Sequence, residues 1–329
     1  MSSSILSVVQ PGLQTTLQDE GRASYSSLGI ARCGALDPNA LSVANLLAGN
    51  NQNHAAIEIS VGPFEISVNR PTVFGVCGQG FQLSVTGRNG KPNEIYSNRS
   101  LLLEAGDSLL AKNTADSGRL YIAVAGGFDI DPVLGSTSTD LYAKFGGFCG
   151  RSLQRGDNLP CQSAKYNTGN AHQLRIAAPN FRVRAIEGPE YNLLSDDSKQ
   201  RFWQTRWQLD SNSNRMAARL KAQPLRFEQS TAPDLLSHAV LPGVIQLPQA
   251  GLPMVLLADA QTTGGYPRIA SVIEADLWQF AQMPTGSYFT FTQCNRIDAF
   301  NAQQYRNQML ERLKLAIKLA RLKQLGHDE

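Results

Sequence analysis

The densest group of chemistry-bearing side chains follows a short apolar run, Met254–Leu257, which predicts a buried strand. Asp259 and Gln261 come just after this run, and the two-residue period of a strand places them on one face if the strand continues. The hydroxyls of Thr262 and Thr263 come next. A carboxylate, a carboxamide and two hydroxyls this close together can bind a small polar substrate, such as an amide or a carboxylate. We therefore predict catalytic roles for these four residues, against the simpler interpretation that Asp259 only caps a turn.

Further residues extend this candidate site. Gly264, Gly265 and Tyr266 follow directly, and Gln246 supplies a second carboxamide upstream. Arg215 follows a loop rich in serine and asparagine. A guanidinium there can clamp a carboxylate or a phosphate, although a solvated surface arginine explains it equally well. We predict substrate-binding roles for all five residues.

An earlier segment is a weaker candidate. Pro11–Arg22 reads PGLQTTLQDEGR, and Gly34–Asp37 follows it. Polar residues packed around glycines form either turns or a site, and turn chemistry is the favoured interpretation of this segment alone. We include Asp19, Arg22 and Asp37 among the predicted substrate-binding residues.

Other signatures of catalysis are missing from the sequence. The histidines lie far apart and form neither HxH nor HExxH, so we expect no metal site; they are His54, His172, His238 and His327. No serine lies in GxSxG and no cysteine has a histidine nearby, which leaves a hydrolase triad without support. Glycine-rich turns at 126–128, 134–140 and 145–151 can present backbone N–H groups to an anion, but none matches GxxxxGK[ST] or GxGxxG.

Composition excludes several classes of protein. With 329 residues, 42% of them hydrophobic, the chain can bury a full core and is not disordered. Six basic and three acidic residues from Asn301 onward account for the whole net charge of +3. Residues 1–300 therefore carry no net charge, which makes them a poor binder of nucleic acid. Five scattered cysteines without CxxC argue against a disulfide framework or structural zinc. We see no signal peptide, and the uncharged stretch 239–258 carries too many prolines and glycines to span a bilayer, so we expect a soluble, cytoplasmic protein.

Short apolar runs, punctuated by 28 glycines and 16 prolines, predict many short strands and few helices. We expect strands at 56–68, 81–85, 109–110, 120–124, 182–186, 254–257 and 288–291. Helices are expected at 38–47, with Asp37 as N-cap, and at 195–203, 270–282 and 301–325. The polar stretch Gln162–Gln173 suggests a linker between two β-barrel or sandwich domains, at 1–165 and 166–300, followed by a basic C-terminal helix at 301–329.

The C-terminal helix carries an apolar stripe of Leu310, Leu313, Ile317 and Ala320. Packing of this stripe on its own domain is favoured over docking to a partner or to a membrane surface. We expect deletion of residues 301–329 to weaken assembly or stability more than substrate recognition.

Nine short sequence motifs stand out along the chain. They are PGLQTTLQDEGR, LGIARCGALD, AIEISVGP, AVAGGF, LGSTSTD, FGGFCGRSLQRGD, the RM and RL pairs near residue 216, GVIQLPQAG and DAQTTGGYP. In this order they resemble the biotin-dependent carboxyltransferase / KipA family, which includes allophanate hydrolase subunit 2-like proteins and the C subunit (PxpC-like) of the prokaryotic ATP-dependent 5-oxoprolinase. The resemblance implies a mainly β fold with a few helices, in which two cyclophilin-like β-barrel domains face a cleft. Cys33 and Ala217 depart from the family pattern, which puts the choice of substrate in doubt.

The resemblance implies three alternative functions. The favoured one is the C subunit of an ATP-dependent 5-oxoprolinase, which works with a KipI-like (PxpB) subunit and a LamB/YcsF-like (PxpA) subunit to open the lactam of 5-oxoproline to L-glutamate. The second is a biotin-dependent carboxyltransferase that acts on urea or another amide, with carboxybiotin from a separate carrier. The third is a KipA-like regulatory protein that sequesters a KipI-like partner.

The sequence has no biotin-attachment Met-Lys-Met string and no glycine-rich ATP-grasp signature. We therefore expect this chain alone to bind no cofactor, with ATP used by the complex. Both enzymatic alternatives require a planar amide to be held and activated. We assign hydrogen bonding of that amide to Asp259, Gln261 and Gln246, and stabilisation of a developing oxyanion to Thr262 and Thr263.

Overall fold

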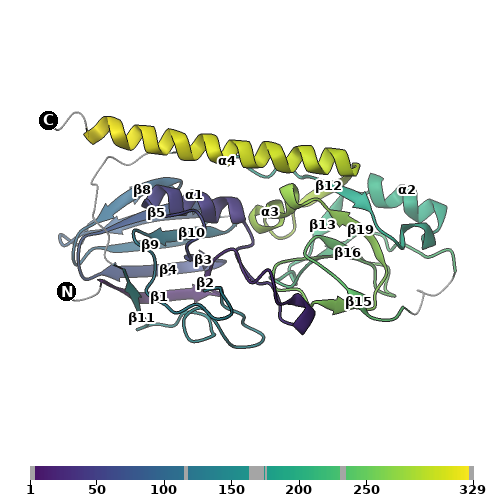
Figure 1. The fold of residues 1–329 in the computed structure, drawn as a ribbon, viewed down its shortest axis with the longest axis horizontal. Helices are drawn as coiled ribbons and strands as arrows, with labels where there is room; N and C mark the ends of the chain where they lie inside the picture. The colour runs from purple at the N-terminus through teal and green to yellow at the C-terminus, as the bar shows by residue number, and fades with distance from the viewer. Residues whose placement is uncertain (1–3, 115–117, 163–173, 175, 230–234, 326–329) are drawn as a thin grey trace. The chain divides into compact units, whose positions relative to one another are not determined.

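The computed structural model describes residues 4–114, 118–162, 174, 176–229 and 235–325, and the chain forms two compact units (Figure 1). Unit 1 comprises Met1–Arg22, Cys33–Ala178 and Gln308–Glu329, and unit 2 comprises Ala23–Arg32 and Pro179–Asn307. These ranges differ from the expected domains, because a short N-terminal segment belongs to unit 2 and the last part of the chain belongs to unit 1. The expected linker at 162–173 lies outside the described residues, except for Gln162.

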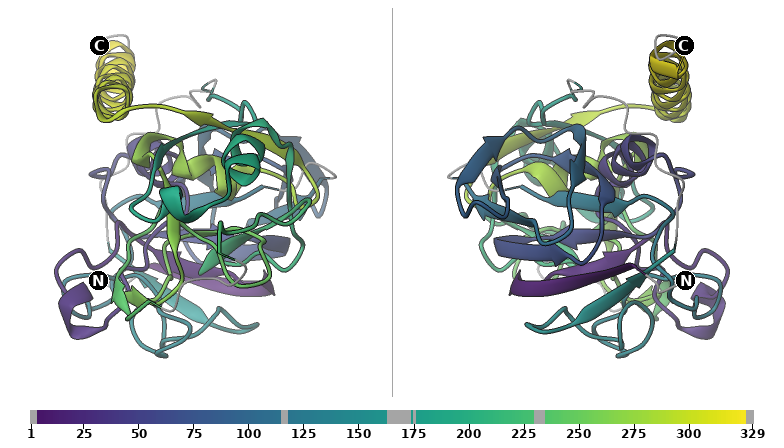
Figure 2. Two further views of the ribbon diagram at one scale, coloured as in Figure 1. Left: turned by 90° about the vertical axis from the view of Figure 1, so that its right-hand side faces the viewer. Right: turned by 90° about the vertical axis from the view of Figure 1, so that its left-hand side faces the viewer.

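Unit 1 contains two antiparallel sheets around one apolar core (Figure 2, right). The six-stranded sheet has the order β11-β1-β4-β9-β6-β7, with β1 (Ser4–Leu13), β4 (Val61–Val68), β6 (Phe81–Thr86), β7 (Pro92–Ile95), β9 (Ser108–Asn113) and β11 (Asn158–Cys161). The five-stranded sheet has the order β2-β3-β10-β5-β8, with β2 (Thr16–Gln18), β3 (Ala56–Ile59), β5 (Thr72–Gly78), β8 (Arg99–Leu103) and β10 (Leu120–Val124).

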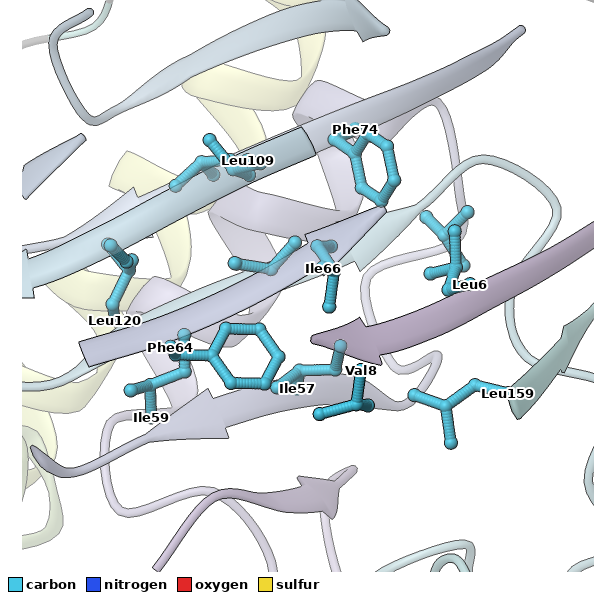
Figure 3. Packing of buried hydrophobic residues seen from close by; sticks show 14 of the residues in the cluster. Leu6, Val8, Ile57, Ile59, Phe64, Ile66, Phe74, Leu109, Leu120 and Leu159 are labelled. Carbon is cyan, nitrogen blue, oxygen red and sulfur yellow. The ribbon is translucent and has the colours of Figure 1, made fainter. Parts of the chain in front are cut away.

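The core of unit 1 is built from alternate residues of both sheets (Figure 3). Phe64 and Ile66 on β4 meet Ile57 on β3 and Phe74 on β5, and all four side chains are fully buried. The two-residue period of a strand sends every second side chain to this core, which explains the alternating pattern in the sequence.

Helix α1 (Pro38–Ala48) packs against the outer face of the five-stranded sheet. Asp37 caps it by accepting hydrogen bonds from the backbone N–H groups of Asn39 and Ala40, and Gly49 ends it at a φ of 90°. Gly75 on β5 lies directly under the helix, where a Cβ atom would clash with the carbonyl oxygen of Ala44. The expected helix and both of its end signals are therefore confirmed.

Unit 2 is a closed barrel of seven strands (Figure 2, left). The order is β12-β19-β16-β17-β14-β13-β20, with β12 (Arg182–Glu187), β13 (Trp207–Leu209), β14 (Ala217–Lys221), β16 (Val244–Gln246), β17 (Met254–Leu256), β19 (Arg268–Val272) and β20 (Tyr288–Gln293). Antiparallel pairs form most of the barrel, and a parallel pair between β12 and β20 closes it. A separate ribbon pairs β15 (His238–Ala239) with β18 (Thr263–Gly264).

The remaining helical elements are η1 (Ser26–Leu28), η2 (Tyr191–Leu193), α2 (Asp196–Gln204), α3 (Glu274–Gln282) and α4 (Arg296–Leu325). The helix expected at 270–282 is wrong in its first part, because residues 268–272 pair with β12 and β16 as strand β19. Helix α4 begins five residues before the expected position, where Asn295 and Asp298 each accept a hydrogen bond from the other's backbone N–H.

The mainly β fold with a few helices is confirmed, with a closed barrel in unit 2 and two sheets around one core in unit 1. The apolar stripe of α4 packs on its own unit: Ile317 is buried among the residues around α1, with Leu310 and Leu313 beside it. The side chain of Ala320 lies outside the described part. None of the described helices is both long and apolar enough to cross a lipid bilayer.

Candidate functional site

The predicted catalytic segment is a turn and not the extension of a strand. Strand β17 ends at Leu256, and the chain then turns so that the N–H of Ala260 donates to the carbonyl of Leu257 at 3.0 Å. The strand does not continue past Leu256, so its period does not place Asp259 and Gln261 on one face. The turn instead separates them: Asp259 is half-buried and Gln261 is exposed.

Arg215 and Asp259 form a bidentate ion pair. The Nε and Nη2 atoms of Arg215 donate to Oδ2 and Oδ1 of Asp259, each at 2.8 Å. Their side chains are only 4% and 12% exposed, and the N–H of Asp259 also donates to the carbonyl of Arg215 at 3.0 Å. Charge-assisted hydrogen bonds of this kind hold both groups in one geometry. The pair therefore anchors the turn after β17 to the start of β14, and direct contact of either side chain with substrate stays a prediction.

A cavity of about 280 Å³ lies beside this turn and within unit 2. Its lining is apolar over much of its surface, with a few polar groups: Ala23, Ser26, Arg32, Val240, Leu241, Pro242, Ala258, Ala260, Gln261, Thr262, Val272, Glu274 and Leu277. Predicted residues Gln261 and Thr262 thus line a cavity of the size that a small organic molecule fills. The contribution of residues 23–32 was not expected, because they precede the barrel by about 150 residues and only the tertiary fold joins them to unit 2.

Gln246 has no partner for either polar atom of its carboxamide among the described residues. Its side chain is fully buried on β16, where the register places it opposite Met254 on β17 and Arg268 on β19. Gly264 lies over it: a Cβ atom on residue 264 would stand 2.8 Å from Nε2 of Gln246 and 3.4 Å from Nε2 of Gln261. The carboxamides of Gln246 and Gln261 therefore both lie close to the place that a side chain on residue 264 would take. The carboxamide of Gln246 has no hydrogen-bond partner among the described residues.

The other residues of the Gly-Gly segment lie on or beside the β15–β18 ribbon. Thr263 is exposed and pairs through its backbone with Ala239, and Tyr266 is 49% exposed. A Cβ atom on Gly265 would stand 3.0 Å from the carbonyl oxygen of Leu235. The oxyanion role predicted for Thr262 and Thr263 stays a prediction.

His238 is a residue that the sequence did not single out for this site. It pairs with Gly264 across the ribbon, and its Nδ1 lies 3.1 Å from the carbonyl oxygen of Leu236. Since a carbonyl oxygen only accepts, this contact places a proton on Nδ1. Its Nε2 atom is buried without a partner among the described residues. The feature that marks His238 as a candidate is its pairing opposite Gly264, and this pairing becomes visible only in the folded chain.

A second ion pair borders the same region. Arg268 donates from Nε and Nη2 to the two carboxylate oxygens of Glu190, at 2.9 and 2.8 Å. These side-chain hydrogen bonds hold the pKa of Glu190 below its usual value. No group of three or more His, Cys, Asp or Glu residues suited to a metal ion occurs in the part of the chain that the structure describes.

The predicted residues of unit 1 have structural contacts. Asp19 Oδ1 accepts hydrogen bonds from Oγ of Ser136 at 2.6 Å and of Ser138 at 2.5 Å, and its Oδ2 accepts from the N–H of Thr137 at 2.6 Å. This carboxylate ties the glycine-rich loop at 134–140 to the end of β2. Its role in binding substrate stays a prediction.

Arg22 and Asp37 are also buried, at 1% and 3% exposure. Arg22 donates to the carbonyl oxygens of Val133 and Ser138, and its guanidinium stacks on the ring of Phe145 at 4.6 Å. Asp37 caps α1. Structural contacts therefore engage both side chains, and Nη1 of Arg22 is buried without a hydrogen-bond partner among the described residues. Contact of either side chain with substrate stays a prediction.

The family model described as "carboxyltransferase domain, subdomain A and B" matches residues 28–293. This chain belongs to that carboxyltransferase family. The matched region of the carboxyltransferase-family chain includes every predicted site residue of unit 2, together with Asp37, and begins after Asp19 and Arg22.

Curated relatives extend this similarity over nearly the whole carboxyltransferase-family chain. It is 42% identical over 309 residues to the protein of Escherichia coli that is named as the C subunit of 5-oxoprolinase, covering 94% of this chain and 97% of that protein. The protein of the same name from Haemophilus influenzae is 38% identical over 284 residues, covering 84% and 87%.

The solved structure of the Kluyveromyces lactis urea amidolyase shares the fold of this carboxyltransferase-family chain. Its TM-score is 0.85 at 24% identity, and the match covers 95% of this chain but only 20% of that much longer one. The two departures from the family pattern do not line the cavity. Cys33 is buried in unit 1, and Ala217 packs against Val240, Leu256 and Ala260 in unit 2.

Proposed function

We propose that this chain is the C subunit of a prokaryotic ATP-dependent 5-oxoprolinase complex and helps to open the lactam of 5-oxoproline to L-glutamate. The observation that carries the proposal is the similarity to the E. coli protein named as the C subunit of 5-oxoprolinase, at 42% identity over 94% of this chain and 97% of that protein. Similarity of this extent covers both units and therefore the whole of the candidate site.

The cavity in unit 2 supports this function on chemical grounds. 5-Oxoproline is a small ring with one amide and one carboxylate, and a cavity of about 280 Å³ is large enough for it. Gln261 and Thr262 offer donors and acceptors for the amide, and the exposed Arg32 supplies a positive charge for the carboxylate.

The charged pair beside the cavity supplies rigidity. Because two hydrogen bonds join Arg215 to Asp259, the pair fixes the turn that carries Gln261 and Thr262. Groups held in place before the substrate arrives stabilise a developing charge without reorganisation at the moment of reaction. We assign Asp259 a positioning role for this reason, with Gln261 and Thr262 closest to the substrate.

The proposed complex contains two further chains, a KipI-like (PxpB) subunit and a LamB/YcsF-like (PxpA) subunit, and consumes ATP. The test is reconstitution of the three purified chains with ATP and 5-oxoproline, with L-glutamate as the product measured. We expect glutamate only when all three chains and ATP are present. A well-folded complex of all three that forms no glutamate would reject the proposal.

The name of the matching family favours a second candidate, which is carboxyl transfer from carboxybiotin to urea or another amide. This reaction also requires a planar amide to be held, so the same cavity serves it. The assay is transfer of labelled carboxyl from free carboxybiotin to urea by the purified chain. Carboxylated urea in this assay, without glutamate in the reconstitution, would favour the second candidate.

A further inference from the structure

The unsatisfied carboxamide of Gln246 is the starting point. A fully buried polar group without a partner destabilises the folded state, so native proteins rarely retain one without a function or a bound molecule. Both its Oε1 and its Nε2 lack a partner among the described residues. The amide therefore offers one acceptor and two donors to a ligand.

The backbone at Gly264 lies directly against this amide. Gly264 lies over it without a Cβ atom, at a position where such an atom would stand 2.8 Å from Nε2. Even an alanine at 264 would press on the carboxamide, so the backbone of Gly264 packs directly against it. Gln261 lies at the same point and also lines the cavity, so the two regions adjoin.

A second polar atom lies on the same face of the ribbon. His238 is directly opposite Gly264, and residues opposite one another in an antiparallel pair send their side chains to one face. The Gly264 position faces Gln246, so the His238 ring lies on the Gln246 side of the ribbon. Its Nε2 is buried without a partner among the described residues. Polar groups from two elements therefore border this space, which suits a polar ligand.

We propose that the carboxamide of Gln246 binds the amide edge of a lactam. A lactam ring forces its amide into the cis form, so the N–H and the C=O lie on the same edge. A primary carboxamide pairs with such an edge through two hydrogen bonds, with Nε2 donating to the C=O and Oε1 accepting from the N–H. An extended trans amide, whose N–H and C=O point in opposite directions, cannot make both bonds with one carboxamide. This inference rests on the proposed function and adds to it the residue that recognises the cis amide of the lactam.

Access to the amide requires the ribbon to move. Gln246 has no exposed surface, and the cover consists of β15 and β18, which pair over only two residues each. So short a ladder is opened at low cost compared with a strand inside the barrel. Entry of the lactam beneath Gly264 exchanges an unsatisfied amide for a paired one.

The test measures equilibrium binding to the full-length chain, and to the assembled complex without ATP, by isothermal titration calorimetry. The three ligands are 5-oxoproline, its N-methyl derivative, which lacks the N–H, and proline, which lacks the lactam carbonyl. We expect 5-oxoproline to bind at least about tenfold more tightly than either analogue, since each analogue loses one of the two hydrogen bonds.

Three variants address the carboxamide itself. Gln246→Leu removes both hydrogen bonds, Gln246→Glu keeps an acceptor but removes the donors, and Gly264→Ala places a Cβ atom 2.8 Å from Nε2 of the amide. We expect each to weaken 5-oxoproline binding by about tenfold or more. The matched control is Gln82→Leu, an exposed glutamine on β6 in unit 1, which should bind as the wild type does.

Stability separates a binding role from a structural one. Gln246→Leu removes a buried polar group that has no partner among the described residues, so its unfolding midpoint should equal or exceed that of the wild type. Wild-type affinity for 5-oxoproline in Gln246→Leu would overturn the inference, because the lactam would then bind without this amide. Equal binding of the N-methyl lactam, or no lactam binding in either form of the protein, would also overturn it.

The binding test of Gln246 and the reconstitution assay can fail independently of one another. Glutamate formation at the wild-type rate by a complex carrying Gln246→Leu would remove the inference and leave the proposed function standing. Lactam binding that depends on Gln246, in a complex that forms no glutamate, would reject the proposed function and leave the inference standing.

Discussion

Arg215 and Asp259, 44 residues apart in the sequence, hold one another through two hydrogen bonds of 2.8 Å with almost no exposed surface. The pair connects the start of strand β14 to the turn that carries the predicted catalytic segment. Neither residue is close to the other in any local motif, and barrel strands β14 and β17 bring them together.

Replacing Asp259 with alanine should destabilise the chain by about 3 kcal/mol, because it leaves the buried guanidinium of Arg215 without its carboxylate. Urea denaturation measures this change. The control is Asp196→Ala, which removes an ion pair with Lys199 whose carboxylate is 97% exposed. That variant should stay close to the wild type in stability, because an exposed ion pair contributes little. An Asp259→Ala protein that keeps both wild-type stability and wild-type glutamate formation in the complex would exclude Asp259 from the site.

Replacing Gly75 with alanine should destabilise unit 1 by about 3 kcal/mol, because the new Cβ atom would clash with backbone atoms of α1, including the Ala48 nitrogen at 2.5 Å. Thermal unfolding measures the change. The control is Gly87→Ala, where the nearest atom to the new Cβ is the Asp107 carboxylate at 3.5 Å, an ordinary contact distance. Equal midpoints for the two variants would show that α1 can lift from β5 at little cost.

The Glu190–Arg268 pair should make stability depend on acidity. Hydrogen bonds from Arg268 lower the pKa of Glu190 below its usual value of 4.5. A carboxyl group with a depressed pKa contributes stability that is fully present above its usual pKa and is lost as the pH falls through the lowered value. The difference in unfolding free energy between wild type and Glu190→Gln should therefore be largest near neutral pH and shrink below pH 4.5.

Urea denaturation at several pH values measures this difference. Glu94→Gln, at an exposed glutamate on β7, is the control for the general effect of removing a carboxylate. A Glu190→Gln difference that stays constant from neutral to acid pH would contradict the assignment of the pair.

Replacing Ile317 with alanine should destabilise the chain by about 2 kcal/mol, because this residue on α4 is 5% exposed and packs beside α1. Leu319→Ala, two residues away on the same helix and 50% exposed, is the matched control and should be near neutral. Chemical denaturation compares the two. Lactam affinity should be unchanged in both variants, since Ile317 belongs to unit 1 and the candidate cavity belongs to unit 2. Lost lactam affinity with unchanged stability in Ile317→Ala would contradict this.

Local elements of the fold could be predicted well. Helix α1 was predicted with both ends, because Asp37 and Gly49 act on backbone groups only a few residues away. Alternation of apolar residues predicted strands such as β6 and β12 for the same reason. The error at 270–272 has the opposite origin: the apolar spacing there fits a helix, but pairing with β12 and β16 decides for a strand.

The sequence names candidate site residues but not the contacts that they make. Gln246, Gln261 and Gly264 were singled out from the sequence, and the fold brings them to one point. The pairing of Arg215 with Asp259 and the place of His238 opposite Gly264 were missed, since both depend on the register of strands that are distant along the chain.

The sequence by itself determined the family, the β-rich class, the ends of α1 and the residue types that could bind an amide, because each of these depends on short motifs or on neighbouring residues. Only the tertiary structure decided that residues 23–32 join unit 2, that a cavity opens beside Gln261, and that the Gln246 carboxamide stays buried without a partner among the described residues. The physical reason is that burial and hydrogen bonding of these groups are settled when the seven-stranded barrel closes, and closure is a property of long-range pairing that no local pattern records.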